Sequence, residues 1–276
     1  MKIKLYLQRC KRFFDYIIAR FSRKTFDQDK LVQARNAFWK AIDVAIKNPE
    51  TLSYKLSELM EEKGYSLKQT NMLLFSLFFA GIDSTTQSLN YAIYECSKDV
   101  NLQNSVRDDL QKLEDWPLHE VASDVESIQH IILEGLRIFS PVIGVSRVAR
   151  ENITLVTTET DNKHIFHKIK KNELLFPSPN IMNRCPFLFP DEPDKFKPER
   201  WQEKKVSILS LPGLPFGGWK TICPGWLFYQ KFMQIFLAEM LLKFTLKLHN
   251  TGEIKQTGSF INKLSENIIV SFYNHQ

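Results

Sequence analysis

A turn-forming segment places one cysteine directly before a long apolar stretch, and this arrangement constrains the fold more than any other part of the sequence. Residues 216–225 read FGGWKTICPG, and the apolar residues that follow predict a helix from about 226 to 243. Cys223 therefore stands at a helix start, where free backbone N–H groups and the positive end of the helix dipole stabilise a thiolate. A thiolate in this position is typical of a metal-thiolate site.

Helical patterning dominates the first half of the 276-residue chain. Apolar residues recur with the period of an amphipathic helix in five stretches, the longest of which begins with the capping-box signature Ser66-x-x-Gln69. The last stretch stops at Ser140-Pro141, because the residue before a proline avoids helical backbone. The predicted helices span residues 31–47, 51–62, 66–96, 102–113 and 121–139.

Short runs typical of strands replace this pattern after residue 145. The predicted strands span residues 145–149, 153–157, 165–169, 174–176 and 268–272. A proline-rich irregular stretch lies between them at 177–215, and a long loop region of this kind usually serves a site. The sequence thus predicts a mainly α fold with a minor β portion.

Positive charge is concentrated at the N-terminus. Residues 1–24 hold eight Lys and Arg side chains against one Asp, a local charge of +7 in a chain whose net charge is +6. Because apolar residues are interspersed as in an amphipathic helix, we predict a separate N-terminal segment that packs on the protein or lies on an anionic membrane. We expect no nucleic-acid binding, since no basic and aromatic interleaving continues downstream.

The apolar runs and the cysteines exclude several classes of protein. The longest runs, such as residues 77–82, are too short to cross a bilayer, so we expect neither a spanning helix nor a signal peptide. The cysteines lack the spacing of zinc sites or of a disulfide framework, which favours a reducing, cytoplasmic location with peripheral membrane contact as the alternative. They are Cys10, Cys96, Cys185 and Cys223. His164 and His167 lie in a lysine-rich stretch and are expected to be solvated.

Two further motifs precede the cysteine loop in a fixed order. Glu134 and Arg137 are spaced i to i+3, which puts a carboxylate and a guanidinium on one helix face. Residues 196–201 then read FKPERW and include Arg200. A lone Glu–Arg pair is common on helix surfaces, so the ordered set is more informative than the pair.

In this order the motifs resemble those of the cytochrome P450 family. The later half of that family carries an E-x-x-R helix, a P-E-R-F-like segment and an F-x-x-G-x-R-x-C-x-G haem loop, and the resemblance covers about residues 66–276. It implies a P450-like fold that lacks the N-terminal part of the family's fold. Residues 25–276 would then form a partial haem-thiolate domain after the basic segment 1–24.

The resemblance implies a structural network and a thiolate ligand. Glu134, Arg137 and Arg200 would form a buried network behind the haem, in which every charge must be satisfied. Arg184 resembles an arginine that lies upstream of the same region in the family. Cys223 would be the axial ligand of the iron of a haem b.

The resemblance also implies the residues that would surround the haem. Phe216 would shield the sulfur, Gly225 would allow the helix to approach the porphyrin closely, and Arg147 would pair with a propionate. Residues 80–85 read AGIDST and resemble the family's A-G-x-D-T-T helix segment. Residues of this segment would open a groove for dioxygen and deliver protons through water. In this chain they are Ala80 and Gly81 for the groove and Asp83, Ser84 and Thr85 for the protons.

Three positions depart from the family pattern. Trp219 stands where the haem loop has glycine, and Thr221 stands where it has a basic residue that contacts a propionate. Ser84 replaces a threonine but keeps the hydroxyl.

The resemblance implies monooxygenation of an apolar small molecule, with electrons from a ferredoxin or a flavin reductase. Two alternatives stay open. One is a truncated or degenerate P450-like protein with weak or no haem binding and no catalysis. The other is a membrane-surface or partner-binding module that uses residues 1–24.

Overall fold

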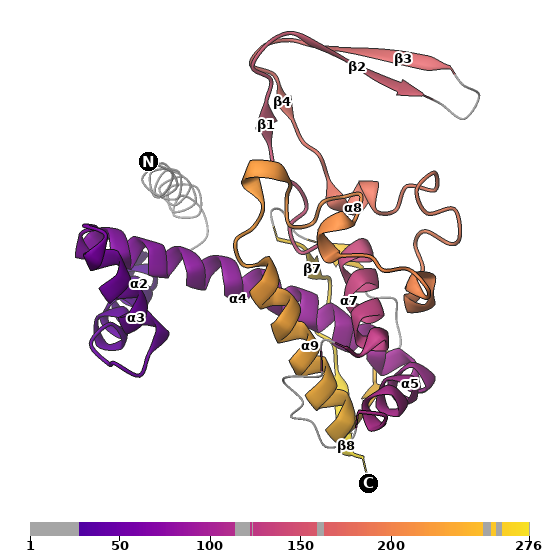
Figure 1. Cartoon of the computed structure of the whole chain (residues 1–276), viewed down its shortest axis with the longest axis horizontal. Coiled ribbons are helices and arrows are strands. Elements are labelled where there is room, and N and C mark those ends of the chain that lie inside the picture. The colour runs from indigo at the N-terminus through magenta and orange to yellow at the C-terminus, as the bar shows by residue number, and fades with distance from the viewer. Residues whose placement is uncertain are drawn as a thin grey trace. The chain divides into compact units, whose positions relative to one another are not determined.

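The computed structural model describes residues 28–113, 122, 124–158, 163–250, 255–257 and 261–275 (Figure 1). Its helices are α2 (Gln28–Ala45), α3 (Leu52–Glu62), α4 (Leu67–Lys98), α5 (Val100–Gln111), α7 (Glu126–Ile138), α8 (Pro179–Met182) and α9 (Trp226–Lys243). Its strands are β1 (Arg147–Val148), β2 (Ile153–Thr158), β3 (His164–Ile169), β4 (Leu174–Leu175), β5 (Phe244–Leu248), β6 (Gln256–Thr257), β7 (Lys263–Leu264) and β8 (Val270–Asn274). The predicted mainly α fold with a minor β portion is confirmed. The basic segment 1–24, which includes Cys10, lies outside the described residues.

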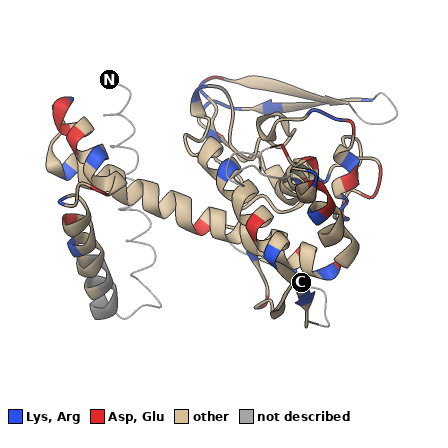
Figure 2. Ribbon diagram, turned by 60° about the horizontal axis from the view of Figure 1, so that its bottom comes forward, with Lys and Arg blue, Asp and Glu red and all other residues tan. Residues whose placement is uncertain are grey.

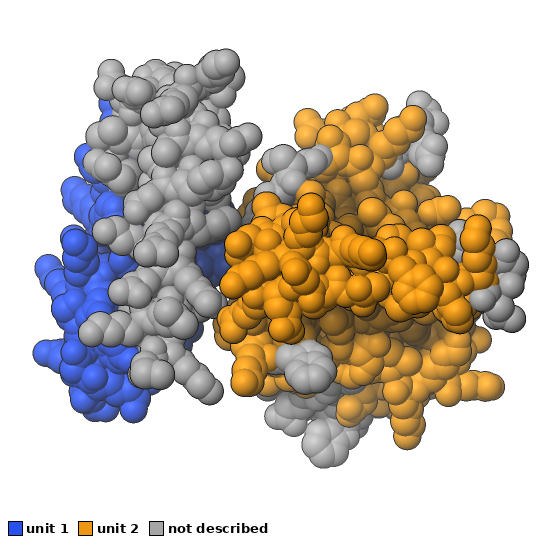
Figure 3. Space-filling model, turned by 90° about the horizontal axis from the view of Figure 1, so that it is seen from above, with its two compact units in different colours: residues 1–82 blue, residues 83–276 orange. Residues whose placement is uncertain are grey.

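The chain divides into two compact units, residues 1–82 and residues 83–276 (Figure 3). The division falls inside α4, so this helix contributes residues to both units. The sequence-based division after residue 24 stays a prediction. Basic and acidic residues are interspersed along the ribbon of the described elements (Figure 2).

Aromatic contacts join α2 to α4 in the first unit. The ring of Phe38 on α2 meets that of Phe75 on α4 edge to face, with centroids 4.8 Å apart. The backbone N–H of Ser66 donates to Oε1 of Gln69 at 2.9 Å, which is one half of the capping box expected from the sequence. The start of α4 therefore follows from local sequence.

The core of the second unit lies between α5, α7 and α9. On α7, Ile128 and Ile131 have no exposed surface, and on α9 the same holds for Leu237 and Leu241. The apolar residues of α9 are distributed around the whole helix, so it buries one face in the core and leaves Phe228 and Leu242 exposed on another. This helix directly follows the cysteine loop, so the loop is anchored to the core.

In the described residues, four two-stranded antiparallel sheets accompany the helices. The pair β2 and β3 forms a hairpin in which Ile153 lies opposite Ile169, and Figure 1 shows it as the longest pair of strands. The pair β5 and β8 brings the end of α9 next to the C-terminal strand, with Leu246 opposite Phe272.

Some element boundaries differ from the sequence-based prediction. The helix expected at 121–139 begins at Glu126, and the strand expected at 145–149 is reduced to β1. The stretch 177–215 is not wholly irregular, because it contains α8 and the 3-10 turns η1 (Pro198–Trp201) and η2 (Ile208–Ser210). Strand β5 was missed, since its residues continue the apolar run of α9 without a turn signal.

A buried polar side chain joins α5 to β5. Gln103 has no exposed surface, and its Nε2 donates to the carbonyl oxygens of Cys96 and Leu246 at 2.8 and 3.0 Å. Its Oε1 accepts from the Leu246 N–H at 2.8 Å. Arg107 adds a 2.8 Å hydrogen bond from Nε to the carbonyl oxygen of Leu241 near the end of α9. The transition from helix α9 to strand β5 is therefore fixed by side chains of α5.

Candidate functional site

The cysteine loop is a tight turn that presents its thiol to the outside. The N–H of Cys223 donates to the carbonyl oxygen of Phe216 at 2.7 Å, and the thiol is exposed. Gly217 adopts a φ of +72°, and a Cβ at this position would lie 2.8 Å from the carbonyl oxygen of Thr221. The loop therefore requires glycine at position 217.

The two unusual residues of the loop are compatible with its backbone. Trp219 lies in the 3-10 turn η3 (Trp219–Thr221), whose φ range suits any L-residue, so the freedom of glycine is not needed there. Thr221 donates from Oγ1 to the carbonyl oxygen of Gly218 and accepts from Nη2 of Arg147, both at 3.0 Å. The structure thus brings together the two positions that the sequence relates to a haem propionate, although 74 residues separate them.

Gly225 leaves space beside the sulfur. It is the N-cap of α9, and its φ of −89° is open to any residue. A Cβ on Gly225 would lie 3.8 Å from Sγ of Cys223, which is ordinary van der Waals contact. The described protein atoms therefore do not themselves require glycine at this position.

Phe216 links the loop to α9. Its ring lies 5.1 Å from that of Tyr229, centroid to centroid, and Tyr229 is buried. Burial raises the pKa of the Tyr229 phenol far above its usual value, because the charged phenolate would be desolvated there. Phe216 is half-buried and holds Cys223 through its carbonyl oxygen.

Glu134 and Arg137 form an ion pair in which neither side chain has exposed surface. Arg137 donates from Nε to Oε2 at 2.9 Å and from Nη2 to Oε1 at 2.8 Å. Arg200 reaches Oε1 through Nε at 3.2 Å. The Lys197 N–H and the Trp201 Nε1 each donate to the same carboxylate at 2.9 Å. These donors satisfy the carboxylate, which the burial of a charge requires.

Both arginines also bind the loop of residues 191–195 through its backbone. Arg137 donates from Nη1 to the carbonyl oxygen of Pro193 at 2.6 Å and from Nη2 to that of Lys195 at 3.0 Å. Arg200 donates from Nη1 to the carbonyl oxygen of Asp191 at 2.7 Å. The network therefore joins α7, η1 and this loop.

Trp201 is the member of this cluster that the sequence analysis did not identify. It follows Arg200 directly, and the signal that could have revealed it is that a buried indole N–H needs an acceptor. Arg184 does not reach the carboxylate. Its Nη2 donates to the carbonyl oxygen of Ile138 at 3.0 Å, and its Nη1 lies 3.6 Å from Asp194.

Helix α4 runs without interruption through the residues expected above the haem. Ala80 is exposed, Asp83 and Ser84 are half-buried, and Thr85 is buried. Apart from its own helix, a Cβ on Gly81 would meet no described atom within 4 Å. The roles of these residues in dioxygen binding and proton delivery stay predictions.

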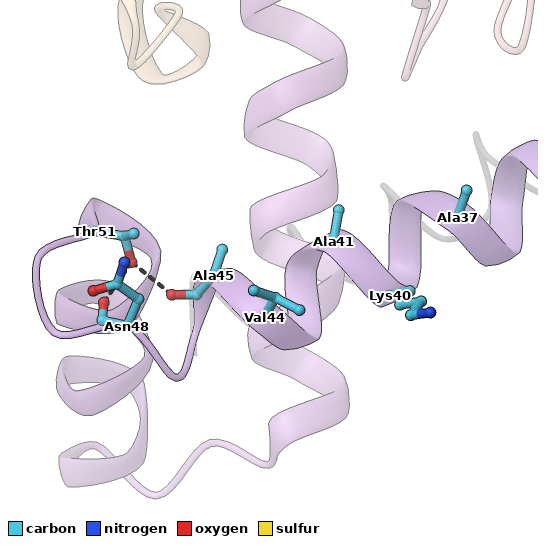
Figure 4. Close-up of a pocket in the computed structure, with 7 residues that line it drawn as sticks. All are labelled: Ala37, Lys40, Ala41, Val44, Ala45, Asn48 and Thr51. Carbon is cyan, nitrogen blue, oxygen red and sulfur yellow. Dashed lines mark hydrogen bonds between the residues drawn. The ribbon is translucent and has the colours of Figure 1, made fainter.

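A shallow hollow of about 560 Å³ lies beside α2 (Figure 4). Lys40 is the only charged residue among those lining it, and Thr51 at its edge donates to the carbonyl oxygen of Ala45 at 2.6 Å.

Within the described ranges, no group of three or more His, Cys, Asp and Glu side chains is arranged to hold a metal ion. None of the helices in the described part of the chain has the length and apolarity needed to cross a membrane.

Comparison with known proteins supports the sequence resemblance. Residues 3–272 match the family model described as Cytochrome P450. The probable cytochrome P450 6a18 of Drosophila melanogaster is 29% identical over 216 residues, which cover 76% of this chain and 41% of that protein. The mitochondrial sterol 26-hydroxylase of Mus musculus is 26% identical over 227 residues, covering 79% and 41% respectively. The chain thus spans about two fifths of the length of these curated relatives.

A solved structure supports the fold. A crystal structure of a cytochrome P450 matches with a TM-score of 0.66 and 22% sequence identity, covering 87% of this chain and 56% of that one. The P450-like fold predicted from the sequence motifs is confirmed.

Proposed function

This chain belongs to the cytochrome P450 family, and on that premise we propose that it is a haem-thiolate monooxygenase. The proposed reaction inserts one oxygen atom of O2 into an apolar small molecule, with electrons from a ferredoxin or a flavin reductase. The name of one relative, a sterol 26-hydroxylase, supports an apolar substrate class.

The observation that carries the proposal is the space beside the sulfur of Cys223. The thiol is exposed at the start of α9, and a Cβ on Gly225 would only touch the sulfur at 3.8 Å. A flat group lying against the sulfur would leave no room for a side chain at position 225. The described protein atoms alone would tolerate a side chain there. The residues present therefore fit a haem b that Cys223 would hold through its sulfur.

When bound, haem b supplies the iron centre at which dioxygen is activated, and a thiolate ligand promotes O–O cleavage. Cys223 would hold this group through Sγ, in a loop fixed by the hydrogen bond from its N–H to Phe216. Arg147 would offer its guanidinium to a propionate carboxylate.

Residues of α4 would deliver the protons. The carboxyl group of Asp83 can release and regain a proton, and the hydroxyl groups of Ser84 and Thr85 can each donate and accept a hydrogen bond, as a relay requires. Ala80 and Gly81, which have the smallest side chains of this segment, would form the groove for dioxygen. The Glu134, Arg137 and Arg200 cluster would hold α7 and η1 in place and take no part in proton transfer.

Reconstitution with haemin tests the proposal. The purified chain should take up one haem, and the reduced form should give the Soret shift of a thiolate ligand with carbon monoxide. Cys223→Ala should abolish that shift, whereas Cys185→Ala should keep it, because Cys185 lies outside the cysteine loop.

The outcomes separate the proposal from its alternative. A degenerate protein would take up no haem, or would bind it with equal affinity after Cys223→Ala. If haem is bound through the thiolate, adding reduced ferredoxin or a flavin reductase then tests electron transfer, and failure with both would remove the proposed donors.

A further inference from the structure

The contact between Arg147 and Thr221 has a defined direction. The Thr221 hydroxyl lies 3.0 Å from the carbonyl oxygen of Gly218, which can only accept, so the single hydroxyl proton points to that oxygen. The lone pairs of Oγ1 therefore face Nη2 of Arg147, also at 3.0 Å. The threonine thus acts as a neutral acceptor that holds a guanidinium group beside the cysteine loop.

The threonine hydroxyl that binds Arg147 carries no charge and therefore does not neutralise the guanidinium. Arg147 is exposed, and no acidic side chain of the described residues forms an ion pair with it. Its other hydrogen bond within the described part of the chain is a long one of 3.4 Å from Nη1 to the carbonyl oxygen of Ser146. A carboxylate in place of Thr221 would neutralise the arginine, whereas a hydroxyl leaves it able to bind an anion through its remaining N–H groups.

The position of Thr221 in the chain relates this contact to the sulfur. It lies two residues before Cys223, in a loop whose shape is set by the glycine at 217 and by the bond from Cys223 to Phe216. The guanidinium is therefore bound to the same loop that carries the exposed Cys223. In the family's loop pattern the residue at this position is basic, whereas here the charge comes from a strand.

We propose that Thr221 is a positioning residue that orients Arg147 toward a carboxylate of the haem. This inference rests on the proposed function. In the family pattern a basic residue of the loop supplies the positive charge. In this chain one oriented arginine supplies it instead. Thr221 therefore affects haem affinity through Arg147 alone and has no contact of its own with the carboxylate.

A double-mutant cycle measures this dependence. Haemin is titrated by absorbance into the wild type, Thr221→Val, Arg147→Ala and the double variant. Thr221→Val keeps the shape of the side chain and should weaken binding about fivefold, since a hydrogen bond to a charged group is lost at an exposed site. In the Arg147→Ala background the same change should have no effect. Thr221→Ser, which keeps the hydroxyl, should restore the affinity of the wild type.

The ligand supplies a second control. Haemin dimethyl ester has no free carboxylate, so the wild type and Thr221→Val should bind it with equal affinity. A purely structural role of Thr221 would weaken the binding of both haemin and its ester, and would do so with or without Arg147. Weaker binding of the ester by Thr221→Val, or an effect of this substitution that is the same with and without Arg147, would overturn the inference. Unchanged haemin affinity in Thr221→Val would also overturn it.

The proposed function can fail separately. If the wild type takes up no haem, or if its uptake does not depend on Cys223, the haem-thiolate assignment is wrong. If uptake depends on Cys223 and the cycle shows no coupling between Thr221 and Arg147, only the positioning role is wrong.

Discussion

The indole Nε1 of Trp201 donates a hydrogen bond of 2.9 Å to Oε2 of Glu134. Both side chains are buried, at 4% and 0% exposure. The carboxylate therefore depends on a neutral donor as well as on Arg137 and Arg200. Because a buried charge that loses a partner keeps its desolvation penalty, each of these donors stabilises the fold.

Replacing Trp201 with Phe should lower the free energy of unfolding by about 2 kcal/mol, because the carboxylate loses a hydrogen bond that its charge strengthens. Glu134→Ala should lower it by about 3–5 kcal/mol, because two guanidinium groups then lose their acceptor. Urea unfolding followed by circular dichroism measures both. Trp39→Phe, in the first unit, is the control for losing an indole, and an equal effect of the two tryptophan substitutions would contradict the role of the hydrogen bond.

Gln103→Ala should destabilise the junction of α5 and β5 strongly. The change leaves two carbonyl oxygens and the N–H of Leu246 without this partner in a buried region, so we expect a loss of about 3 kcal/mol. Gln111→Ala, at an exposed position on the same helix, should change stability by less than about 0.5 kcal/mol. Thermal unfolding compares Gln103→Ala with Gln111→Ala, and similar melting temperatures of the two variants would contradict the prediction.

The cysteines should differ sharply in reactivity. Cys96 has no exposed surface, and burial raises the pKa of its thiol to about 12, whereas Cys223 is exposed. Since the thiolate is the reactive form, iodoacetamide should label Cys223 in the folded protein and leave Cys96 unlabelled until the chain unfolds. Peptide mass spectrometry after timed labelling reads both sites.

The same thiol predicts a pH dependence of stability. In the unfolded chain Cys96 ionises near pH 9.0, whereas the folded chain keeps the proton up to about pH 12. Unfolding therefore releases a proton in this window, and stability should fall as the pH rises through it. Cys96→Ala should remove this part of the decrease, which urea unfolding at about pH 8 and about pH 10 can detect. An identical decrease in both proteins would exclude Cys96 as its source.

Local sequence signals account for most of the helical fold. The helix predicted at 226–243 has these bounds in the structure, and the glycine before it marks its start. Strand β5 begins one residue later and was missed, since an apolar run at the end of a helix gives no signal that its backbone changes. The 3-10 turns within 177–215 were missed for a similar reason, because a proline marks a break in regular structure without specifying the conformation of the residues after it.

The candidate site divides in the same way. The order of motifs identifies Glu134, Arg137 and Arg200 as a set, and the structure brings them together. The contact of Arg147 with Thr221 could not be predicted, because it depends on where a two-residue strand meets a loop 74 residues later. In the sequence, Thr221 is notable only because it replaces a basic residue. In the structure, its hydroxyl accepts a hydrogen bond from Arg147.

Replacing either of two glycines of the cysteine loop with alanine should have a different effect. Gly217→Ala should lower the free energy of unfolding by about 1–3 kcal/mol, because φ is +72° and the new Cβ would approach the Thr221 carbonyl oxygen to 2.8 Å. Gly225→Ala should leave the stability of the haem-free chain within about 0.5 kcal/mol of the wild type, because its backbone is unstrained and the new Cβ would only touch the sulfur. The same variant should take up haemin more weakly, since the methyl group enters the space proposed for the porphyrin. Unfolding without haemin and titration with it separate the two effects. Unchanged haemin affinity in Gly225→Ala would show that no flat group lies against the sulfur at this point.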